Sequence, residues 1–341
     1  MTFFEKIIGN HALKDRLTRD IESNSLSHAY IIEGPHGSGR HTIALTAVAA
    51  IACQQRGSFG NVPCGKCANC RKILSGQSPD VSLISLEEDK ASIGIEAIRS
   101  IKEGLYVAPN DIDVKVYIID DADKLTAQAQ NAFLLSLEEP PSYVLFFLIC
   151  ENSSLLLETV RSRAPTLRTE KVSCREVENY LLSNDNRARE LKEQAPDEFN
   201  TIIHISDGCI GYALELLSGR QRKLVFDCRK VAMDIISILS SPNRASVFEV
   251  ISSMGNKRQE ICRQIVFLQL AIRDLLLLKK SDEVSLCFFD DGEHACELAT
   301  HFTSKQLMDL YDATVKALED LERNANVRLT LISMMQNANL I

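Results

Sequence analysis

The first half of the chain alternates between short apolar runs and longer stretches with helical spacing. Each apolar run is rich in valine, isoleucine and aromatic residues, which is typical of strands buried on both faces of a parallel sheet. The expected strands are residues 29–33, 81–86, 115–119 and 144–150. The expected helices between them are residues 42–53, 94–105 and 124–139. Strand and helix in alternation predict an α/β layered domain.

Beyond about residue 170 the strand pattern fades and helical spacing continues. Ser173, followed three residues later by Glu176, has the spacing of a capping box and predicts a helix start. Residues 204–219 have helical apolar spacing as far as Gly219, and residues 259–278 form a long helical pattern. We therefore expect three domains. Their ranges are 1–170 for the α/β domain, 171–220 for a small helical domain and 221–341 for a helical C-terminal domain.

Composition and charge narrow the functional classes. The chain has 341 residues, of which 45% are hydrophobic and 25% charged, as expected for a multidomain globular protein. A net charge of −8 argues against unaided binding to many DNA phosphates and favours protein partners. The sequence contains no apolar run of about 18 residues. It also has no basic start followed by an apolar block, so we expect a cytoplasmic protein without membrane contact.

Residues 34–42, GPHGSGRHT, resemble a phosphate-binding loop between a strand and a helix. Gly34, Gly37 and Gly39 have the expected spacing. The lysine position holds Arg40, whose planar guanidinium is no conservative replacement. The next position holds His41 in place of a hydroxyl ligand for Mg²⁺, and Thr42 comes one residue late, about 100° further around the helix.

Three interpretations of this loop remain open: a glycine turn kept for folding, weak nucleotide binding without turnover, and a working ATPase. A second motif has the same ambiguity. Asp120 follows the strand 115–119, where a carboxylate would hold Mg²⁺, and Asp121 takes the place of a water-activating glutamate. The alternative interpretation is that residues 120–123 form an acidic loop without a role in metal binding.

Four cysteines predict a metal site. Cys53 is followed by Cys64, Cys67 and Cys70 at tight spacing, which matches a closed tetrahedral site for structural zinc. An iron–sulfur run would need a further cysteine at position 74, which is Leu74. Redox-active thiols and cysteines without a ligand are two further interpretations. The remaining cysteines are expected to be small buried hydrophobic residues. They are Cys150, Cys174, Cys209, Cys228, Cys262, Cys287 and Cys296.

Taken together, these motifs resemble the AAA+ clamp-loader subunits of bacterial DNA polymerase III, of the delta-prime family. The resemblance is close over residues 1–170 and looser beyond. It rests on FEKIIGN, which ends at Gly9-Asn10, on LSHAYIIEGPHGSGR and on the cysteine cluster, which looks like the family's inserted zinc module (53–70). NAFLLSLEEPP (131–141) and ETVRSRA (158–164) are similar to further family motifs, with Ala164 in place of a cysteine.

The resemblance implies a role for Arg163 as an arginine finger, acting in trans on a neighbour's nucleotide. A simpler interpretation is that Arg161 and Arg163 pair with local carboxylates. Two departures, besides Arg40 and His41, argue against catalysis in the chain's own loop. Residues 207–214, where relatives carry the sensor-2 arginine, contain no arginine, and Cys150 stands at the sensor-1 position.

The resemblance therefore implies a P-loop NTPase-like AAA+ domain, a helical lid (171–220) and a helical collar for oligomerisation (221–341). The implied function is that of a non-hydrolysing subunit in a five-membered ring with gamma/tau and delta subunits. That ring opens the sliding clamp and loads it on primed DNA as part of the polymerase III holoenzyme. Two competing hypotheses are an active ATPase of the gamma/tau type that uses Arg40 and Thr42, and a zinc-dependent DNA-binding module.

Overall fold

The computed structural model describes most of the chain in two compact units. The described residues are 2–56, 61–87, 90–240, 251, 254–255, 257–280, 286–323 and 325–338. One unit comprises Met1–Glu176 with Cys209–Tyr212, and the other comprises Val177–Gly208 with Ala213–Ile341. Each unit has its own core, so each is described by itself.

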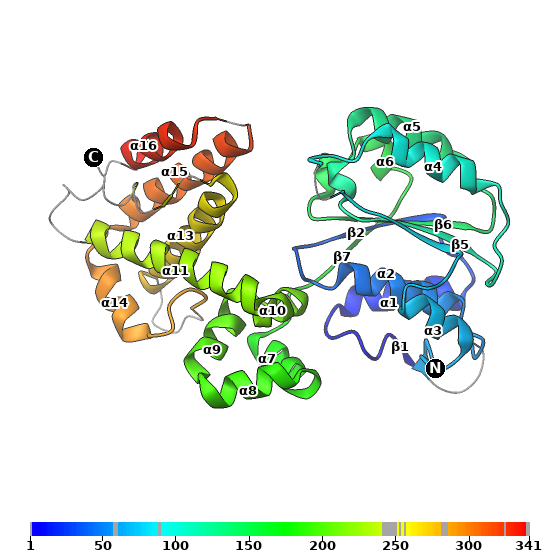
Figure 1. Cartoon of the computed structure of the whole chain (residues 1–341), viewed down its shortest axis with the longest axis horizontal. Coiled ribbons are helices and arrows are strands. Elements are labelled where there is room, and N and C mark those ends of the chain that lie inside the picture. Colours follow the sequence, from blue (N-terminus) through cyan, green and yellow to red (C-terminus); the bar gives the residue numbers. More distant parts are fainter. Residues whose placement is uncertain are drawn as a thin grey trace. The chain divides into compact units, whose positions relative to one another are not determined.

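The first unit is built on a five-stranded, wholly parallel sheet with the order β4-β5-β6-β2-β7 (Figure 1). Its strands are β2 (Ala29–Glu33), β4 (Val81–Ile84), β5 (Lys115–Ile119), β6 (Val144–Cys150) and β7 (Thr166–Arg168). β1 (Thr2–Phe3) pairs separately with β3 (Asn61–Val62). Because β2 lies between β6 and β7, the loop that follows it leaves the sheet from an interior strand.

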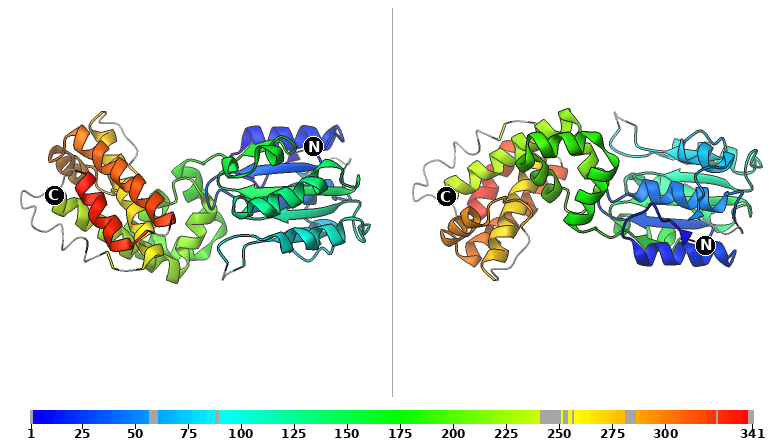
Figure 2. Two further views of the ribbon diagram at one scale, coloured as in Figure 1. Left: turned by 90° about the horizontal axis from the view of Figure 1, so that it is seen from above. Right: turned by 90° about the horizontal axis from the view of Figure 1, so that it is seen from below.

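Helices cover both faces of this sheet (Figure 2). One face carries α1 (His11–Glu22), α2 (Arg40–Ile51) and α3 (Ala68–Leu74), and the other carries α4 (Ile95–Leu105), α5 (Ala127–Glu138) and α6 (Glu158–Arg161). Along β6, Phe147 and Ile149 pack into the first core, whereas Phe146 and Leu148 pack into the second. Both faces of a central strand are therefore apolar, which explains the uninterrupted hydrophobic run.

The predicted strands are confirmed, although β4 is shorter than expected and β7 was not predicted. Only the middle residue of β7 is buried, and three residues are too few to give an apolar pattern. The expected architecture is confirmed: an α/β domain with a parallel sheet is followed by helices. The proposed lid and collar boundaries stay predictions. The collar range includes residues 241–250 and 281–285, which lie outside the described residues.

The rest of the described chain is helical. Its helices are α7 (Cys174–Asn184), α8 (Asn186–Gln194), α9 (Pro196–Ile205), α10 (Ile210–Leu217), α11 (Gly219–Ser240), α13 (Arg258–Leu278), α14 (Gly292–Thr300), α15 (Ser304–Glu322) and α16 (Val327–Asn337). The capping box before α7 is present: the Glu176 carboxylate accepts the Ser173 N–H at 2.9 Å, and the Ser173 hydroxyl accepts the Glu176 N–H at 3.3 Å.

One helical prediction is wrong. Residues 204–219 do not form one helix, because α9 ends at Ile205 and α10 begins at Ile210. Asp207 and Gly208 between them have φ values of 46° and 79°. Such left-handed residues end a helix, and the apolar spacing on either side conceals the break. Gly219 is likewise the first residue of α11 and does not end α10.

A buried carboxylate organises part of the helical unit. Asp274 of α13 is fully buried and accepts backbone N–H groups of Cys287, Phe288 and Phe289 at 2.7–3.3 Å. Burial raises the pKa of Asp274, although these hydrogen bonds and the nearby charge of Arg273 act in the opposite direction. The carboxylate thereby holds residues 287–289 against α13.

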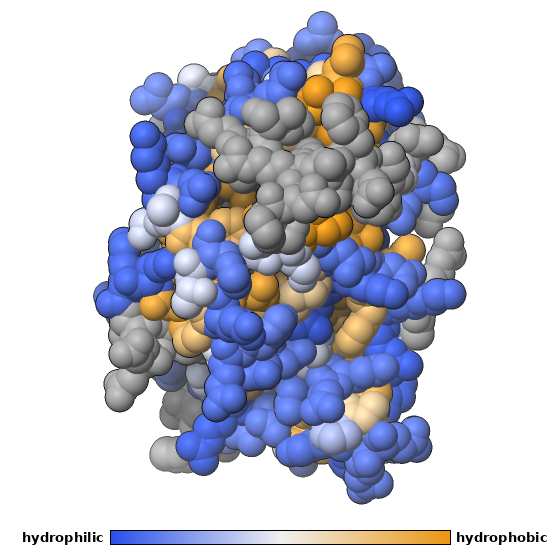
Figure 3. All heavy atoms as spheres, turned by 90° about the vertical axis from the view of Figure 1, so that its left-hand side faces the viewer, coloured by the Kyte–Doolittle hydropathy of each residue, from blue (hydrophilic) through white to orange (hydrophobic). Residues whose placement is uncertain are grey.

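The surface of the helical unit is mostly hydrophilic on the face seen in Figure 3, with smaller hydrophobic areas between. Among the described helices, none combines the length and apolar character that a bilayer crossing requires. The expectation that the remaining cysteines are buried is wrong for Cys296, which is exposed on α14. Cys174 and Cys262 are half-buried, and the other four are buried.

Candidate functional site

The glycine loop joins β2 to α2, and backbone contacts with other segments of the chain hold it in place. Gly37 has a φ of 74°, and a Cβ added there would lie 2.2 Å from the backbone nitrogen of Tyr212. The Gly211 N–H donates to the Gly37 carbonyl at 2.8 Å. Only glycine allows both the positive φ and this close approach. The segment expected to carry the sensor-2 contact therefore reaches the loop through its backbone.

A second set of contacts to the loop comes from the residue that follows β7. The Thr169 hydroxyl donates to the Ser38 hydroxyl at 2.8 Å, and the Thr169 N–H donates to the Glu33 carbonyl at 2.8 Å. A Cβ at Gly34 would lie 1.7 Å from the Thr169 hydroxyl oxygen, so a side chain at that position would displace this hydroxyl. Thr169 thus holds the loop at both of its contacts.

Arg40 is buried, which its sequence position at the start of α2 did not predict. Its side chain is only 9% exposed, and its Nη2 lies 3.6 Å from Oε1 of Glu151. Its Nη1 is buried and has no hydrogen-bond partner among the described residues. His41 is half-buried and Thr42 is exposed. The guanidinium therefore lies among acidic groups at the carboxyl ends of the strands.

Acidic residues gather at this edge of the sheet. Asp120 and Asp121 follow β5, and Asp121 has a φ of 52°, which is unusual for a residue with a side chain. Burial raises the pKa of Asp121, the charges of Asp120 and Asp123 raise it further, and the Arg40 guanidinium lowers it. Asp123 Oδ2 accepts the Glu151 N–H at 3.1 Å, whereas its Oδ1 is buried without a partner in the described chain.

Sequence reasoning missed Glu151, which follows β6 directly. Residues at the carboxyl ends of adjacent parallel strands meet at one edge of the sheet, and that rule could have indicated it. Cys150 itself is fully buried, and burial raises its pKa to about 12. The buried, neutral thiol is a weaker hydrogen-bond donor than the threonine that the resemblance implies at this position.

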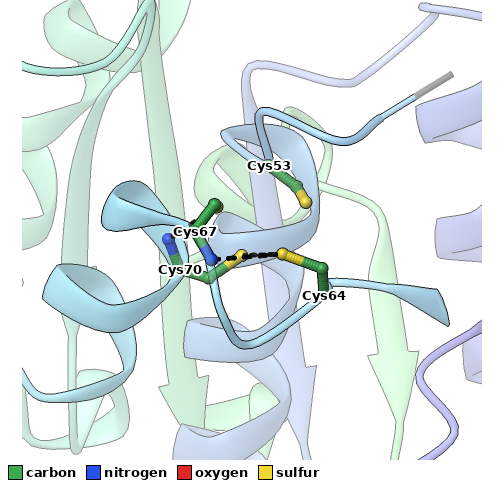
Figure 4. Close-up of side chains that lie close together, drawn as sticks. All are labelled: Cys53, Cys64, Cys67 and Cys70. Carbon is green, nitrogen blue, oxygen red and sulfur yellow. Dashed lines mark hydrogen bonds between the residues drawn. The ribbon is translucent and has the colours of Figure 1, made fainter. Parts of the chain in front are cut away.

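The four predicted cysteines come together (Figure 4). Cys53 follows α2, Cys64 follows β3, Cys67 is the N-cap of α3 and Cys70 lies in its first turn. Their sulfur atoms all lie within 4.8 Å of one another, and Sγ of Cys64 is 4.0 Å from Sγ of Cys70. Four sulfurs bound at about 2.3 Å in a tetrahedron would be separated by about 3.8 Å, so the cluster fits one metal ion.

Backbone N–H groups support negative charge on these sulfurs. The Cys67 N–H donates to Sγ of Cys64 and the Cys70 N–H donates to Sγ of Cys67, both at 3.4 Å. At Cys64, burial would raise the thiol pKa, but the N–H groups of Lys66 and Cys67 outweigh it and lower the pKa to about 6. Burial raises the pKa of Cys70. The loop therefore provides the donors that a metal-bound thiolate requires.

Arg163 follows α6 and is paired locally. Its Nη2 lies 2.6 Å from Oε1 of Glu138, and its Nη1 donates to the Thr159 carbonyl at 2.9 Å. The Arg163 side chain is 33% exposed and that of Glu138 is 44% exposed. A local carboxylate partner is thus present, as the simpler interpretation expected, while the guanidinium still reaches solvent. Arg161 is exposed.

Known proteins similar to this chain are subunits of DNA polymerase III. A family model described as DNA polymerase III, delta subunit, matches residues 9–173. The delta' subunit from Bacillus subtilis (strain 168) is 27% identical over 92% of this chain and 91% of that protein. The delta' subunit from Yersinia pestis is 37% identical over 40% of this chain and 39% of that protein.

The tau subunit from Bacillus subtilis (strain 168) is 30% identical over 63% of this chain. The match spans only 37% of that tau subunit, whereas the match to the delta' subunit of the same organism covers nearly the whole of both proteins. The family match lies on the α/β domain that carries the glycine loop and the cysteine cluster. Over residues 9–173 and along most of its length, the chain is similar to DNA polymerase III subunits of the delta' and tau/gamma kinds.

Proposed function

We propose that this chain is a clamp-loader subunit of DNA polymerase III that does not hydrolyse ATP in its own loop and that supplies Arg163 to the nucleotide of a neighbouring subunit. The observation that carries the first part is the position of Arg40. A phosphate loop uses its cationic residue on the β- and γ-phosphates, but here the guanidinium is buried beside Glu151. His41 follows in place of the metal-binding hydroxyl.

The geometry of Arg163 supports the second part. The guanidinium is partly exposed and contacts Glu138, the Thr159 carbonyl and the Ser162 hydroxyl. A guanidinium has five N–H donors, so donors remain for phosphate oxygens of another molecule. A cationic fork that is held in place at the surface can stabilise transition-state charge across an interface.

The proposed partners are gamma/tau and delta subunits in a five-membered ring, which opens the sliding clamp and loads it on primed DNA. Exposed apolar side chains in the helical unit support a protein interface there. Met308 and Val315 of α15 are 49% and 37% exposed and lie seven residues apart, on one face of the helix. We assign structural zinc to Cys53, Cys64, Cys67 and Cys70, because four sulfurs leave no open position for catalysis.

The test measures ATP turnover by the chain alone and by the assembled ring. The chain alone is expected to show none, and Arg163→Ala is expected to slow turnover at the adjacent site by about 10³-fold or more, because an arginine finger has that effect. Arg161→Ala is the matched control, since it removes an exposed guanidinium two residues away. Turnover by the pure chain, or a ring unaffected by Arg163→Ala, would contradict the proposal.

A further inference from the structure

The geometry points to Arg40 as a resident cation that closes the strand-end site to a divalent metal: its guanidinium neutralises the carboxylates that would otherwise bind the ion. This inference deepens the proposed non-hydrolysing role and rests on it for its functional consequence. On this inference, the side chain of Arg40 prevents the binding of a metal–nucleotide complex, and the glycine loop itself does not.

The first argument is burial. The Arg40 side chain is 9% exposed, and a charge that leaves water needs an opposite charge nearby. Glu151 supplies one carboxylate at 3.6 Å, and the charges of Asp120, Asp121 and Asp123 surround the same place. A guanidinium that pointed at a phosphate in the loop would be expected to leave these acids unpaired; instead it lies among them.

The second argument is that two buried polar atoms in the cluster lack hydrogen-bond partners. Nearly all buried polar atoms in proteins have a hydrogen-bond partner. In this cluster Nη1 of Arg40 and Oδ1 of Asp123 are both buried and lack one among the described residues. A carboxylate oxygen without a partner is a free ligand position for a hard cation. The positive charge of Arg40 compensates the carboxylates in place of a metal ion.

The third argument concerns the loop itself. The contacts of Gly37 with Gly211 and of Ser38 with Thr169 fix the backbone of the glycine loop. The acids at the strand ends are also present. The carboxylates of a metal site are therefore retained around Arg40, although His41 replaces the hydroxyl ligand. Removing the charge of Arg40 is expected to uncover a divalent-cation site formed by these carboxylates.

The experiment uses the full, zinc-loaded chain and Mn²⁺ as the probe, measured by electron paramagnetic resonance and by thermal unfolding. The wild-type chain is expected to bind no Mn²⁺ at millimolar concentration. Arg40→Ala is expected to bind one ion, with a rise in Tm of about 3–5 °C at tenfold excess over the Kd. Adding Asp123→Asn to this variant should abolish the gain.

Arg16→Ala is the matched control. Arg16 also pairs with a carboxylate, Asp20, at 3.0 Å, but within α1 and outside the cluster, so its removal should create no Mn²⁺ site. Arg40→Gln provides a longer neutral side chain if Arg40→Ala does not fold. Mn²⁺ binding by the wild-type chain, or no binding by either folded Arg40 variant, would overturn the inference. The Mn²⁺ measurements use the chain alone, so their outcome is independent of the Arg163 test in the assembled ring.

Discussion

At the scale of single residues, the candidate site depends on which charged groups pair. Arg40 and Arg163 are both arginines that the sequence placed in nucleotide motifs, yet their environments differ. Arg40 is buried beside Glu151, whereas Arg163 is partly exposed and lies beside Glu138. The first guanidinium is committed to its own chain and the second remains accessible to a partner.

Glu138 is expected to orient Arg163. An exposed ion pair contributes about 0.2–1 kcal/mol, so Glu138→Gln should lower the free energy of unfolding by that amount, as measured by urea titration. The neighbouring Glu139 is exposed and has no ion pair in the described part of the chain, so Glu139→Gln is the matched control. A double-mutant cycle with Arg163→Ala that shows no coupling would contradict this role.

Glu33 is expected to make stability depend on pH. Burial alone would raise its pKa, but the Arg168 side chain and the Ser153 N–H outweigh burial and hold the pKa below the ordinary value of 4.5. A depressed carboxyl pKa contributes stability above the unfolded-state value, and this contribution is lost as the pH falls through the folded-state pKa.

The Glu33→Gln variant should therefore be less stable than the wild type by about 1 kcal/mol at pH 7. The difference should shrink as the pH falls below 4.5. Urea unfolding at pH 7 and at acid pH measures it, and Glu103→Gln, which changes an exposed glutamate of α4, serves as the control. An equal difference at both pH values would show that Glu33 does not titrate in this way.

At the scale of elements, the cysteine cluster joins segments that have little other reason to meet. α3 has only seven residues, and β3 has two. Helices this short are marginal by themselves, so the position of α3 depends on tertiary contacts and, on the proposed assignment, on bound zinc. Cys70 and Ile73 of α3 are buried against the first core, which orients the helix even so.

Cys67→Ser is expected to lose bound zinc and to lower the Tm of the α/β unit, since metal binding contributes directly to folding. Zinc content by elemental analysis should fall from one ion per chain to none. Cys296→Ser changes an exposed cysteine outside the cluster and should leave both quantities unchanged. A Cys67→Ser protein with full zinc content would contradict the assignment.

At the scale of the whole molecule, charge is distributed unevenly. The net charge is −8, yet residues 34–79 contain five arginines and lysines and no aspartate or glutamate. This stretch includes the cysteine cluster, whose four thiolates and one zinc ion would carry a charge of −2. Two of the five basic residues are paired elsewhere, Arg40 with Glu151 and Lys72 with Asp111, so this stretch leaves little positive charge for nucleic acid.

The isolated chain is accordingly expected to bind primed DNA only weakly, with a Kd above about 10⁻⁶ M at physiological salt, as for non-specific contacts. Fluorescence anisotropy over a range of salt concentrations measures this. Tight, salt-sensitive binding that Cys67→Ser abolishes would instead support a zinc-dependent DNA-binding module.

The sequence by itself determined the features that local pattern or spacing encodes. These are the buried strands, the glycine loop after the first of them, and the cysteine cluster, whose four members the structure brings together. Hydrophobic periodicity and ligand spacing act over a few residues, so one sequence is enough to show them. The sequence did not predict the break between α9 and α10 at Asp207, because the apolar spacing continues across it.

Only the tertiary structure decided which distant groups meet. The contacts of Arg40 with Glu151, Ser38 with Thr169 and Gly37 with Gly211 join residues more than a hundred positions apart. The order of strands brings Glu151 and Thr169 to the loop, and the start of α10 brings Gly211 to it. No local pattern records these arrangements. Whether the loop residues bind phosphate or one another is therefore set by the folded geometry.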